Sequence, residues 1–145
     1  MKAFSIHELE IGQVAELTKE ISEQDVYAFA ELTGDKNPIH MDKKYAEQTF
    51  FKKQIVHGAL LGGLISAVLG MKMPGPGAIY ESQELSFYKP VYFGDKITAS
   101  AEVEELLKDK NRAIFKTKCI NQNGAIVAEG RSVLLPTKSI QTKNN

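Results

Sequence analysis

The stretch Leu32–Met73 decides the fold of this chain, and it reads LTGDKNPIHMDKKYAEQTFFKKQIVHGALLGGLISAVLGMKM. Its first part is polar and rich in turn residues, and it holds Asp35 and His40. Its last part, from about Gly58 to Lys72, is apolar around its whole circumference, which predicts a long buried helix. A carboxylate, an imidazole and a helix N-terminus thus lie close together in the sequence, as acid–base chemistry on a carbonyl compound would need.

Glycines within this predicted helix call for a physical reason. Gly62, Gly63 and Gly70 each cost roughly 1 kcal/mol of helix stability relative to alanine. We therefore expect something to approach the helix backbone closely, and that could be a sheet or a ligand.

The chain as a whole has the size and charge of one ordinary domain. It has 145 residues, a formal net charge of zero and a pI near 6.8, so no global field attracts nucleic acid. We expect a single domain over residues 1–137 and a flexible tail over residues 138–145.

Neither a membrane protein nor a secreted one is expected. The apolar run 59–73 would span only ~22 Å as a helix, and a bilayer core is roughly 30 Å thick. The N-terminal MKAFSIHELE lacks the apolar core of a secretory signal. The only cysteine, Cys119, excludes an internal disulfide and is expected to be packed and inert. We expect a cytoplasmic protein.

The order of predicted elements indicates an α+β domain. A strand over residues 11–21 is followed by a helix that Ser22 and Asp25 cap as a capping box and Gly34 ends. Asp42 caps a short second helix that runs to residue 47, and residues 49–56 are irregular. Four strands are predicted after the long helix, over residues 78–88, 96–106, 112–120 and 125–135. We expect an antiparallel sheet of about five strands wrapped round the long central helix.

Asp35 and His40 are the first candidates for chemistry. Asn37 and Pro38 stiffen the turn between them, because proline fixes its own φ and restricts the residue before it. A carboxylate and an imidazole that converge on one water can act as base and acid in a single addition. The plainer alternative is that both residues are ordinary loop side chains.

The start of the long helix is the second candidate. The backbone N–H of Gly58 has no intrahelical partner and can donate to a carbonyl that develops negative charge. Alternatively, Gly58 is simply a helix-start residue. His57 is expected to support the loop, and Ser66 to bond the carbonyl one turn back unless Asp35 or His40 packs over it.

For two further groups of polar residues, the lysines and the possible metal ligands, the simpler interpretation is preferred. The lysines are expected to form a solvated face, or alternatively to contact phosphates of an anionic ligand; they are Lys43, Lys44, Lys52 and Lys53. The histidines and the cysteine have no metal-ligand spacing on one helix face, so no metal site is expected.

These motifs together resemble a known family. The stretch Ala30–Asp42, followed by Ile55-Val56-His57-Gly58, is similar to the signature of the R-specific enoyl-CoA hydratases, which are MaoC-like dehydratases of hot-dog fold. The stretch Leu85–Val91 and the following Gly94-Asp95 resemble the family's next strand and turn.

The resemblance implies a reaction and roles for individual residues. Water would add reversibly across the 2,3 double bond of a trans-2-enoyl thioester to give the (R)-3-hydroxyacyl thioester, without a cofactor. Asp35 and His40 would be catalytic, and the N–H of Gly58 would polarise the thioester carbonyl. Supporting roles would fall to Asn37, His57 and Ser66.

The resemblance also implies partners. The substrate would be an enoyl-CoA or an enoyl-acyl carrier protein. The fold implies a homodimer with acyl tunnels near the interface, and Ile65 and Leu69 are candidate acyl-pocket residues.

Two other functions stay open on the sequence. A hot-dog acyl thioesterase also needs a carboxylate and a polarised thioester, but many such enzymes place a lone carboxylate on the central helix, and this helix has none. A non-catalytic acyl-CoA-binding module is the other alternative. The presence of Asp35, His40 and Gly58 together argues against it.

Overall fold

The computed structural model of the chain describes residues 2–138. Apart from Lys138, the flexible tail predicted for residues 138–145 lies outside the described residues. No helix within the described part is long and apolar enough to cross a membrane.

Five strands form one antiparallel sheet in the order β1-β3-β4-β5-β2. Their bounds are β1 (Val14–Glu20), β2 (Ile79–Phe87), β3 (Lys96–Leu107), β4 (Arg112–Ile120) and β5 (Ile126–Leu135). The four strands predicted after the long helix are confirmed, with ends that differ by a residue or none. The first strand begins later than predicted, at Val14 rather than residue 11.

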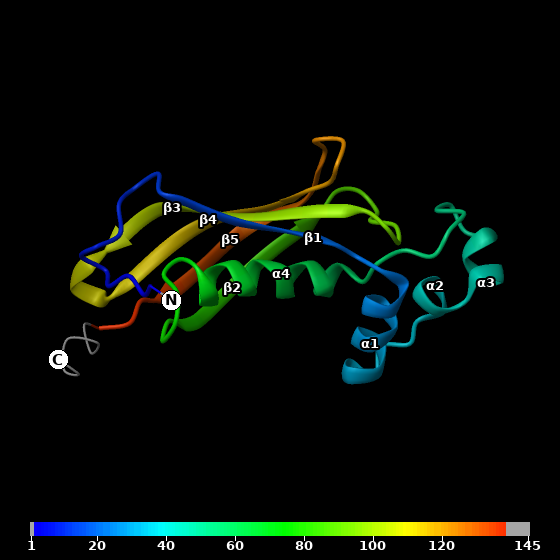
Figure 1. Cartoon of the computed structure of the whole chain (residues 1–145), viewed down its shortest axis with the longest axis horizontal. Coiled ribbons are helices and arrows are strands. Elements are labelled where there is room, and N and C mark those ends of the chain that lie inside the picture. Colours follow the sequence, from blue (N-terminus) through cyan, green and yellow to red (C-terminus); the bar gives the residue numbers. More distant parts are fainter. Residues whose placement is uncertain (1, 139–145) are drawn as a thin grey trace.

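The long helix α4 (Gly58–Met71) lies along one face of the curved sheet (Figure 1). It packs mainly against β3, where Ala99 and Ala101 leave room for a close approach. Each fully buried leucine, isoleucine or valine contributes about 1.5–3 kcal/mol relative to an exposed one. The core side chains of α4 and the facing strands are Leu61, Ile65, Val68, Leu69, Ile97, Val103, Phe115 and Cys119.

Side chains of β2 explain two of the glycines at the α4 surface. A Cβ atom at Gly58 would lie 2.8 Å from the ring of Phe87, and one at Gly62 would lie 2.8 Å from Oε1 of Gln83. Gln83 also donates from Nε2 to the carbonyl oxygen of Gly62, over 3.3 Å. The close approach predicted from the sequence is therefore made, at these two positions, by the sheet.

The expectation of a helix buried on every side is wrong for the single chain. Ala59, Gly63 and Met71 of α4 are exposed, on a helix that carries no charged residue. An apolar helix with an exposed face lacks a covering surface among residues 2–138.

Three short helices lie beyond the end of the sheet, next to the start of α4 (Figure 1). They are α1 (Glu23–Thr33), α2 (Pro38–Met41) and α3 (Lys43–Glu47). The capping box of α1 is present, since the Asp25 N–H donates to Ser22 Oγ over 3.1 Å and the Ser22 N–H donates to Asp25 Oδ2 over 2.9 Å. Gly34 ends α1 with a φ of 84°, in the left-handed region that glycine adopts without strain.

The helix α2 was not predicted from the sequence. Asn37 caps it, because its side-chain oxygen accepts from the Ile39 N–H over 3.2 Å, and Pro38 occupies its first turn. A single turn of four residues is too short for an apolar period to reveal it. Its consequence is that His40 lies on a helical turn rather than on a free loop.

Candidate active site

Asp35 lies in a turn between α1 and α2 whose backbone is held by local hydrogen bonds. The Asp35 N–H donates to Thr33 Oγ1 over 3.1 Å, and the Asn37 N–H donates to Asp35 Oδ1 over 3.3 Å. The carboxylate itself is exposed. Asn37 therefore both caps α2 and contacts the carboxylate of Asp35 through its backbone.

His40 is buried, with only 8% of its surface exposed. Its Nδ1 lies 2.7 Å from the carbonyl oxygen of Ile55. A carbonyl can only accept, so Nδ1 carries the proton and Nε2 is left with a lone pair. Burial lowers the pKa of His40, and the neighbouring His57 lowers it further, against the opposing effects of the Ile55 carbonyl and Asp35. A neutral His40 can accept a hydrogen bond from water at Nε2.

His57 contacts both Asp35 and His40. Its Nε2 is 2.9 Å from the backbone oxygen of Asp35. Its ring stacks on that of His40, with centroids 3.8 Å apart and planes inclined by 26°, and packs at 4.8 Å against Phe29.

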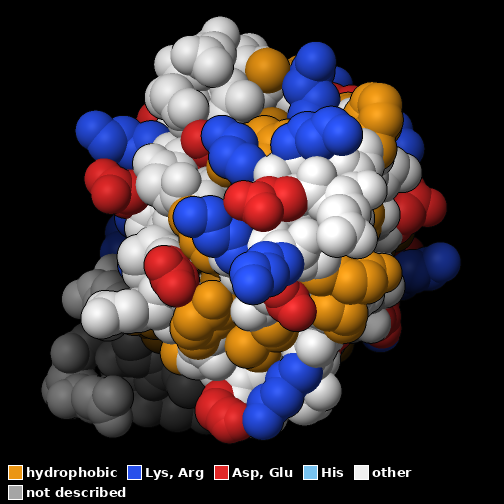
Figure 2. All heavy atoms as spheres, turned by 90° about the vertical axis from the view of Figure 1, so that its right-hand side faces the viewer, with side chains coloured by type: hydrophobic (Ala, Val, Ile, Leu, Met, Phe, Trp, Pro, Cys, Tyr) orange, Lys and Arg blue, Asp and Glu red, His pale blue; other side chains and the backbone are white. Residues whose placement is uncertain are grey.

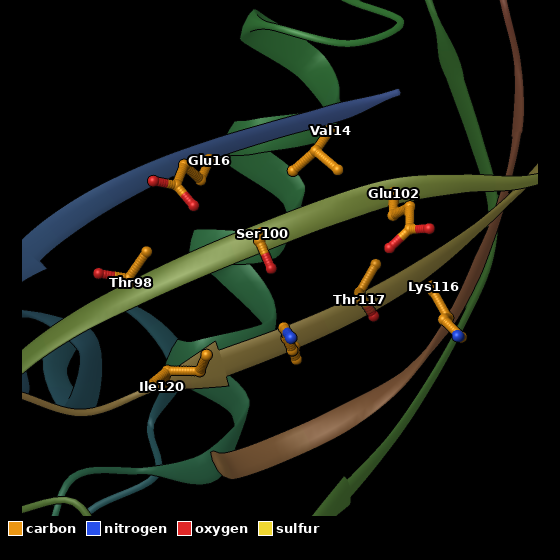
Figure 3. A pocket seen from close by; sticks show the side chains of 9 residues that line it. Val14, Glu16, Thr98, Ser100, Glu102, Lys116, Thr117 and Ile120 are labelled. Carbon is orange, nitrogen blue, oxygen red and sulfur yellow. The ribbon is translucent and has the colours of Figure 1, made fainter. Parts of the chain in front are cut away.

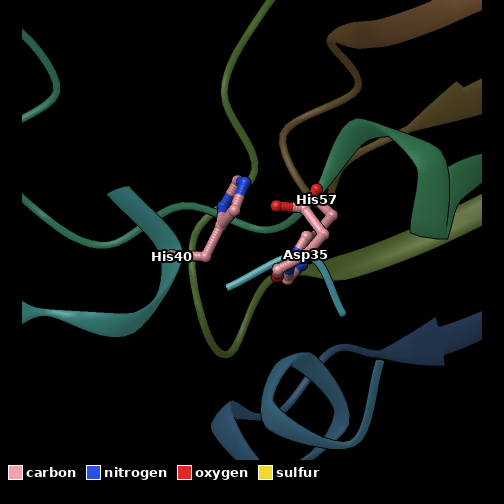
Figure 4. Close-up of side chains that lie close together, drawn as sticks. All are labelled: Asp35, His40 and His57. Carbon is pink, nitrogen blue, oxygen red and sulfur yellow. The ribbon is translucent and has the colours of Figure 1, made fainter. Parts of the chain in front are cut away.

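Asp35, His40 and His57 gather between the α1–α2 turn and the start of α4 (Figure 4), and each offers a possible ligand atom within 4.8 Å of the others. They are not arranged as a metal centre. An imidazole binds a metal through a lone pair in its own plane, and two nearly parallel stacked rings cannot direct their lone pairs at one ion. One nitrogen of each ring also faces a backbone carbonyl.

The N–H of Gly58, the first residue of α4, finds no acceptor among residues 2–138. Gly58 and His40 both line a cavity of about 450 Å³ whose wall is mostly apolar. Asp35 does not line it and lies beside His40 instead. The cavity wall consists of His40, Phe51, Ile55, Val56, Gly58, Ala59, Leu61, Phe87, Tyr88, Lys89, Pro90 and Val91.

Three other residues named from the sequence lie outside this wall. Ile65 and Leu69 are fully buried in the core, and Ser66 is half-buried on α4. Their proposed roles in acyl binding and support stay predictions. The apolar residues that do line the cavity come from residues 51–56 and 87–91 and from Ala59 and Leu61 of α4, and none of them was named as a pocket residue from the sequence.

Basic side chains gather on the end of the molecule where α2 and α3 lie (Figure 2). Between residues 43 and 53 four exposed lysines stand against one glutamate, and none of the four forms an ion pair within the described part of the chain. Phe51, within this segment, and Ile55, two residues after it, line the cavity, as does Lys89. The positive charge therefore lies beside the cavity.

A second hollow, of about 310 Å³, lies on the face of the sheet opposite α4 (Figure 3). Its charged side chains are of both signs, with Glu16 and Glu102 beside Lys116 and Lys118. None of the candidate catalytic residues lines it.

Known proteins resemble this chain over nearly its whole length. An "(R)-specific enoyl-CoA hydratase" of Rhodospirillum rubrum is 48% identical over 128 residues, which cover 88% of each chain. One of the same name from Aeromonas caviae is 45% identical and covers 90% of this chain and 97% of its own. The solved structure of the unliganded R-hydratase PhaJ1 from Pseudomonas aeruginosa matches with a TM-score of 0.89 and 43% identity, and the match covers 94% of this chain and 88% of that one.

The domain family described as "MaoC like domain" matches residues 7–127, a span that contains the α1–α2 turn, all of α4 and the first four strands. The sheet wrapped round α4 is the hot-dog arrangement that the sequence resemblance implied, and the solved hydratase shares it. With the fold, the motif and the relatives in agreement, this chain belongs to the MaoC-like dehydratase family.

Proposed function

We propose that this protein is an (R)-specific enoyl-CoA hydratase, a hydro-lyase that adds water to trans-2-enoyl-CoA. The observation that carries the proposal is the placement of a neutral His40 and the carboxylate of Asp35 beside a cavity that the unpartnered N–H of Gly58 also lines. The relatives named above support both the reaction and its stereochemistry.

The pair is suited to hold and activate one water. A water molecule has two hydrogens to donate, and the Asp35 carboxylate and His40 Nε2 are two acceptors on neighbouring side chains. The water oxygen then bonds to C3 while the pair takes its proton. The pair returns a proton to C2 on the same face, so that the addition is syn and no net proton is consumed.

The electrons of the double bond move toward the thioester carbonyl during this step. The N–H of Gly58 would donate to the carbonyl oxygen as its negative charge develops. One such donor in comparable sites is worth roughly 3–4 kcal/mol of transition-state stabilisation. The thioester itself is the electron sink, so the proposed reaction requires no cofactor.

The reaction is tested with crotonyl-CoA. We expect loss of the enoyl absorbance and formation of (R)-3-hydroxybutyryl-CoA by chiral analysis. Asp35→Asn should lower kcat by about 100-fold or more, whereas Asp109→Asn, at an exposed carboxylate in a turn after β3, should not. Equal activity of wild type and Asp35→Asn would refute the role of the pair. Thiol release without hydration would instead identify a thioesterase, and acyl-CoA binding without turnover a binding module.

We further propose that the working form is a homodimer joined through β2. This strand is at the edge of the sheet, and all but one of its residues are exposed on the single chain. Ile79 and Phe87 at the two ends of this strand and the adjoining Tyr88 expose 52–60% of their surface, which leaves apolar side chains along this edge for a partner to cover. A second copy would cover β2 and the exposed face of α4 and would lie next to the Phe87 and Tyr88 side of the cavity.

The acyl carrier and the compartment also belong to this proposal. We expect coenzyme A thioesters as substrates, and acyl carrier protein thioesters are the alternative that a comparison of KM values decides. A reducing compartment such as the cytoplasm suits a protein whose single cysteine is free and buried.

A further inference from the structure

His57 contacts each part of the proposed catalytic machinery. Its Nε2 lies 2.9 Å from the backbone oxygen of Asp35, and its ring lies 3.8 Å from that of His40. It is also the residue on which α4 begins, directly before Gly58. His57 is 2% exposed and does not line the cavity, so it can act on the reaction only through these neighbours.

The hydrogen bonds of His57 define its protonated nitrogen. The backbone oxygen of Asp35 can only accept, so Nε2 carries the proton. Nδ1 is buried and has no hydrogen-bond partner among residues 2–138.

We infer that His57 is a positioning residue: it holds the backbone of Asp35 and the ring of His40 in one arrangement, and through its contact with His40 it influences the pH below which the pair loses activity. The inference rests on the proposed hydratase function. It gives His57 a defined effect on the reaction, beyond support of the loop.

The groups around His40 make this effect measurable. Burial lowers the pKa of His40, and His57 lowers it further, while the Ile55 carbonyl and Asp35 raise it. Tyr88 and Lys89 are the other ionisable groups in the same cavity wall. Removing the imidazole of His57 removes one of the effects that keep His40 neutral, so protonated His40 should persist to higher pH.

Two substitutions separate the contacts of His57. His57→Phe keeps an aromatic ring against His40 and Phe29 but loses the hydrogen bond to Asp35. We expect kcat to fall roughly 10- to 100-fold, with KM for crotonyl-CoA changed by less than about twofold. His57→Gln can keep a donor for the Asp35 carbonyl but loses the stacked ring, so its kcat should lie between those of wild type and His57→Phe. In both variants the acid limb of the kcat/KM profile should move to higher pH.

A second measurement does not depend on catalytic turnover. NMR titration of the His40 ring should give a higher midpoint in both variants than in wild type, whether or not the protein hydrates crotonyl-CoA. This separates failure of the inference from failure of the proposed function. His7→Phe, at an exposed histidine outside the cavity, is the matched control and should change neither readout.

The inference is overturned by either of two results. One is a kcat of His57→Phe within about twofold of wild type. The other is a fall in activity at every pH with both the acid limb and the His40 midpoint unmoved, because a merely structural residue would act in that way. If circular dichroism shows that His57→Phe is not folded, the same criteria are applied to His57→Gln, using the acid limb of its kcat/KM profile and its His40 titration midpoint.

Discussion

Asp35 and His40 lie close together, but one is exposed and the other is buried. The carboxylate of Asp35 is exposed, whereas His40 is buried and donates a hydrogen bond from Nδ1 to a backbone carbonyl. Burial lowers the pKa of His40 and so favours its neutral form, which leaves Nε2 free to accept. At neutral pH the pair therefore offers water two acceptors.

The first prediction concerns the pH dependence of this pair. Burial holds the pKa of His40 below its ordinary value of about 6.5, so His40 stays neutral, and able to accept a proton, as the pH falls to that value. We expect the acid limb of kcat/KM for crotonyl-CoA to have its midpoint below about pH 6.5. A midpoint clearly above this value would mean that His40 is not the group whose protonation ends activity.

A second prediction concerns Gly58. In Gly58→Ala the new Cβ would lie 2.8 Å from the Phe87 ring, which must then move. Phe87 lines the cavity, so we expect a severalfold rise in KM or fall in kcat, read from steady-state kinetics. Gly70→Ala is the control on the same helix, because no atom lies within 4 Å of its new Cβ. It should leave the kinetics unchanged and raise helix stability by up to about 1 kcal/mol.

The sequence contained enough to predict that Asp35 and His40 lie close together, because a stiff turn keeps them together through local bonds; their catalytic roles stay a prediction. It did not predict which apolar residues line the cavity. Phe87 and Val91 reach the cavity from beyond α4, and their approach depends on how β2 registers with β5 and packs on the helix. That arrangement is a property of the folded sheet, so no local spacing reveals it.

At the scale of helices and strands, both ends of α1 are set by residues that lie close together in the sequence. Ser22, Asp25 and Gly34 mark both of its ends, and the sequence therefore predicted it well. The exposed face of α4 shows the opposite case. Its apolar circumference correctly predicted a helix, but which side faces the sheet and which side needs another surface is decided by tertiary packing.

The capping box gives a prediction about stability. Ser22→Ala removes the acceptor for the Asp25 N–H at the start of α1, which should lower the free energy of unfolding by about 1 kcal/mol. Urea unfolding measures this change. Ser100→Ala, at a serine without a side-chain hydrogen bond within residues 2–138, should have a smaller effect. An unchanged unfolding midpoint in Ser22→Ala would show that the cap contributes little.

The molecule as a whole has no net charge, but its charged residues are unevenly distributed over the surface. The chain has zero net charge, yet the segment from Lys43 to Lys53 is strongly basic; Phe51 within it and Ile55 just after it line the cavity. An anionic thioester carrier such as coenzyme A would be attracted to this end of the molecule.

This asymmetry predicts a salt-dependent KM. Lys43→Glu combined with Lys52→Glu should raise KM for crotonyl-CoA by about three- to tenfold at low salt, with little change in kcat. Because salt screens exposed charges, the difference from wild type should shrink as ionic strength rises. Lys108→Glu with Lys110→Glu, in the turn after β3, is the matched charge reversal away from the cavity and should leave KM unchanged.

The two edges of the sheet give the test of assembly. Both β1 and β2 are edge strands with an exposed apolar residue, Val14 on β1 and Ile79 on β2. Only β2 lies beside the cavity, and its Gln83 and Phe87 approach α4, whose outer face is bare. A second copy on β2 would extend the sheet and cover that face, whereas one on β1 would leave it exposed.

We therefore expect Ile79→Lys to weaken the dimer, because its lysine would place an unpaired charge in the interface on β2. Val14→Lys should leave the dimer intact, because its lysine on β1 would lie in solvent. Light scattering after size-exclusion chromatography over a range of protein concentrations measures the dimer dissociation. The activity of Ile79→Lys should fall as dilution separates the subunits, since Phe87 and Tyr88 on the cavity side would lose their cover. A dimer that dissociates in Val14→Lys and persists in Ile79→Lys would place the interface on β1 and leave the α4 face to some other surface.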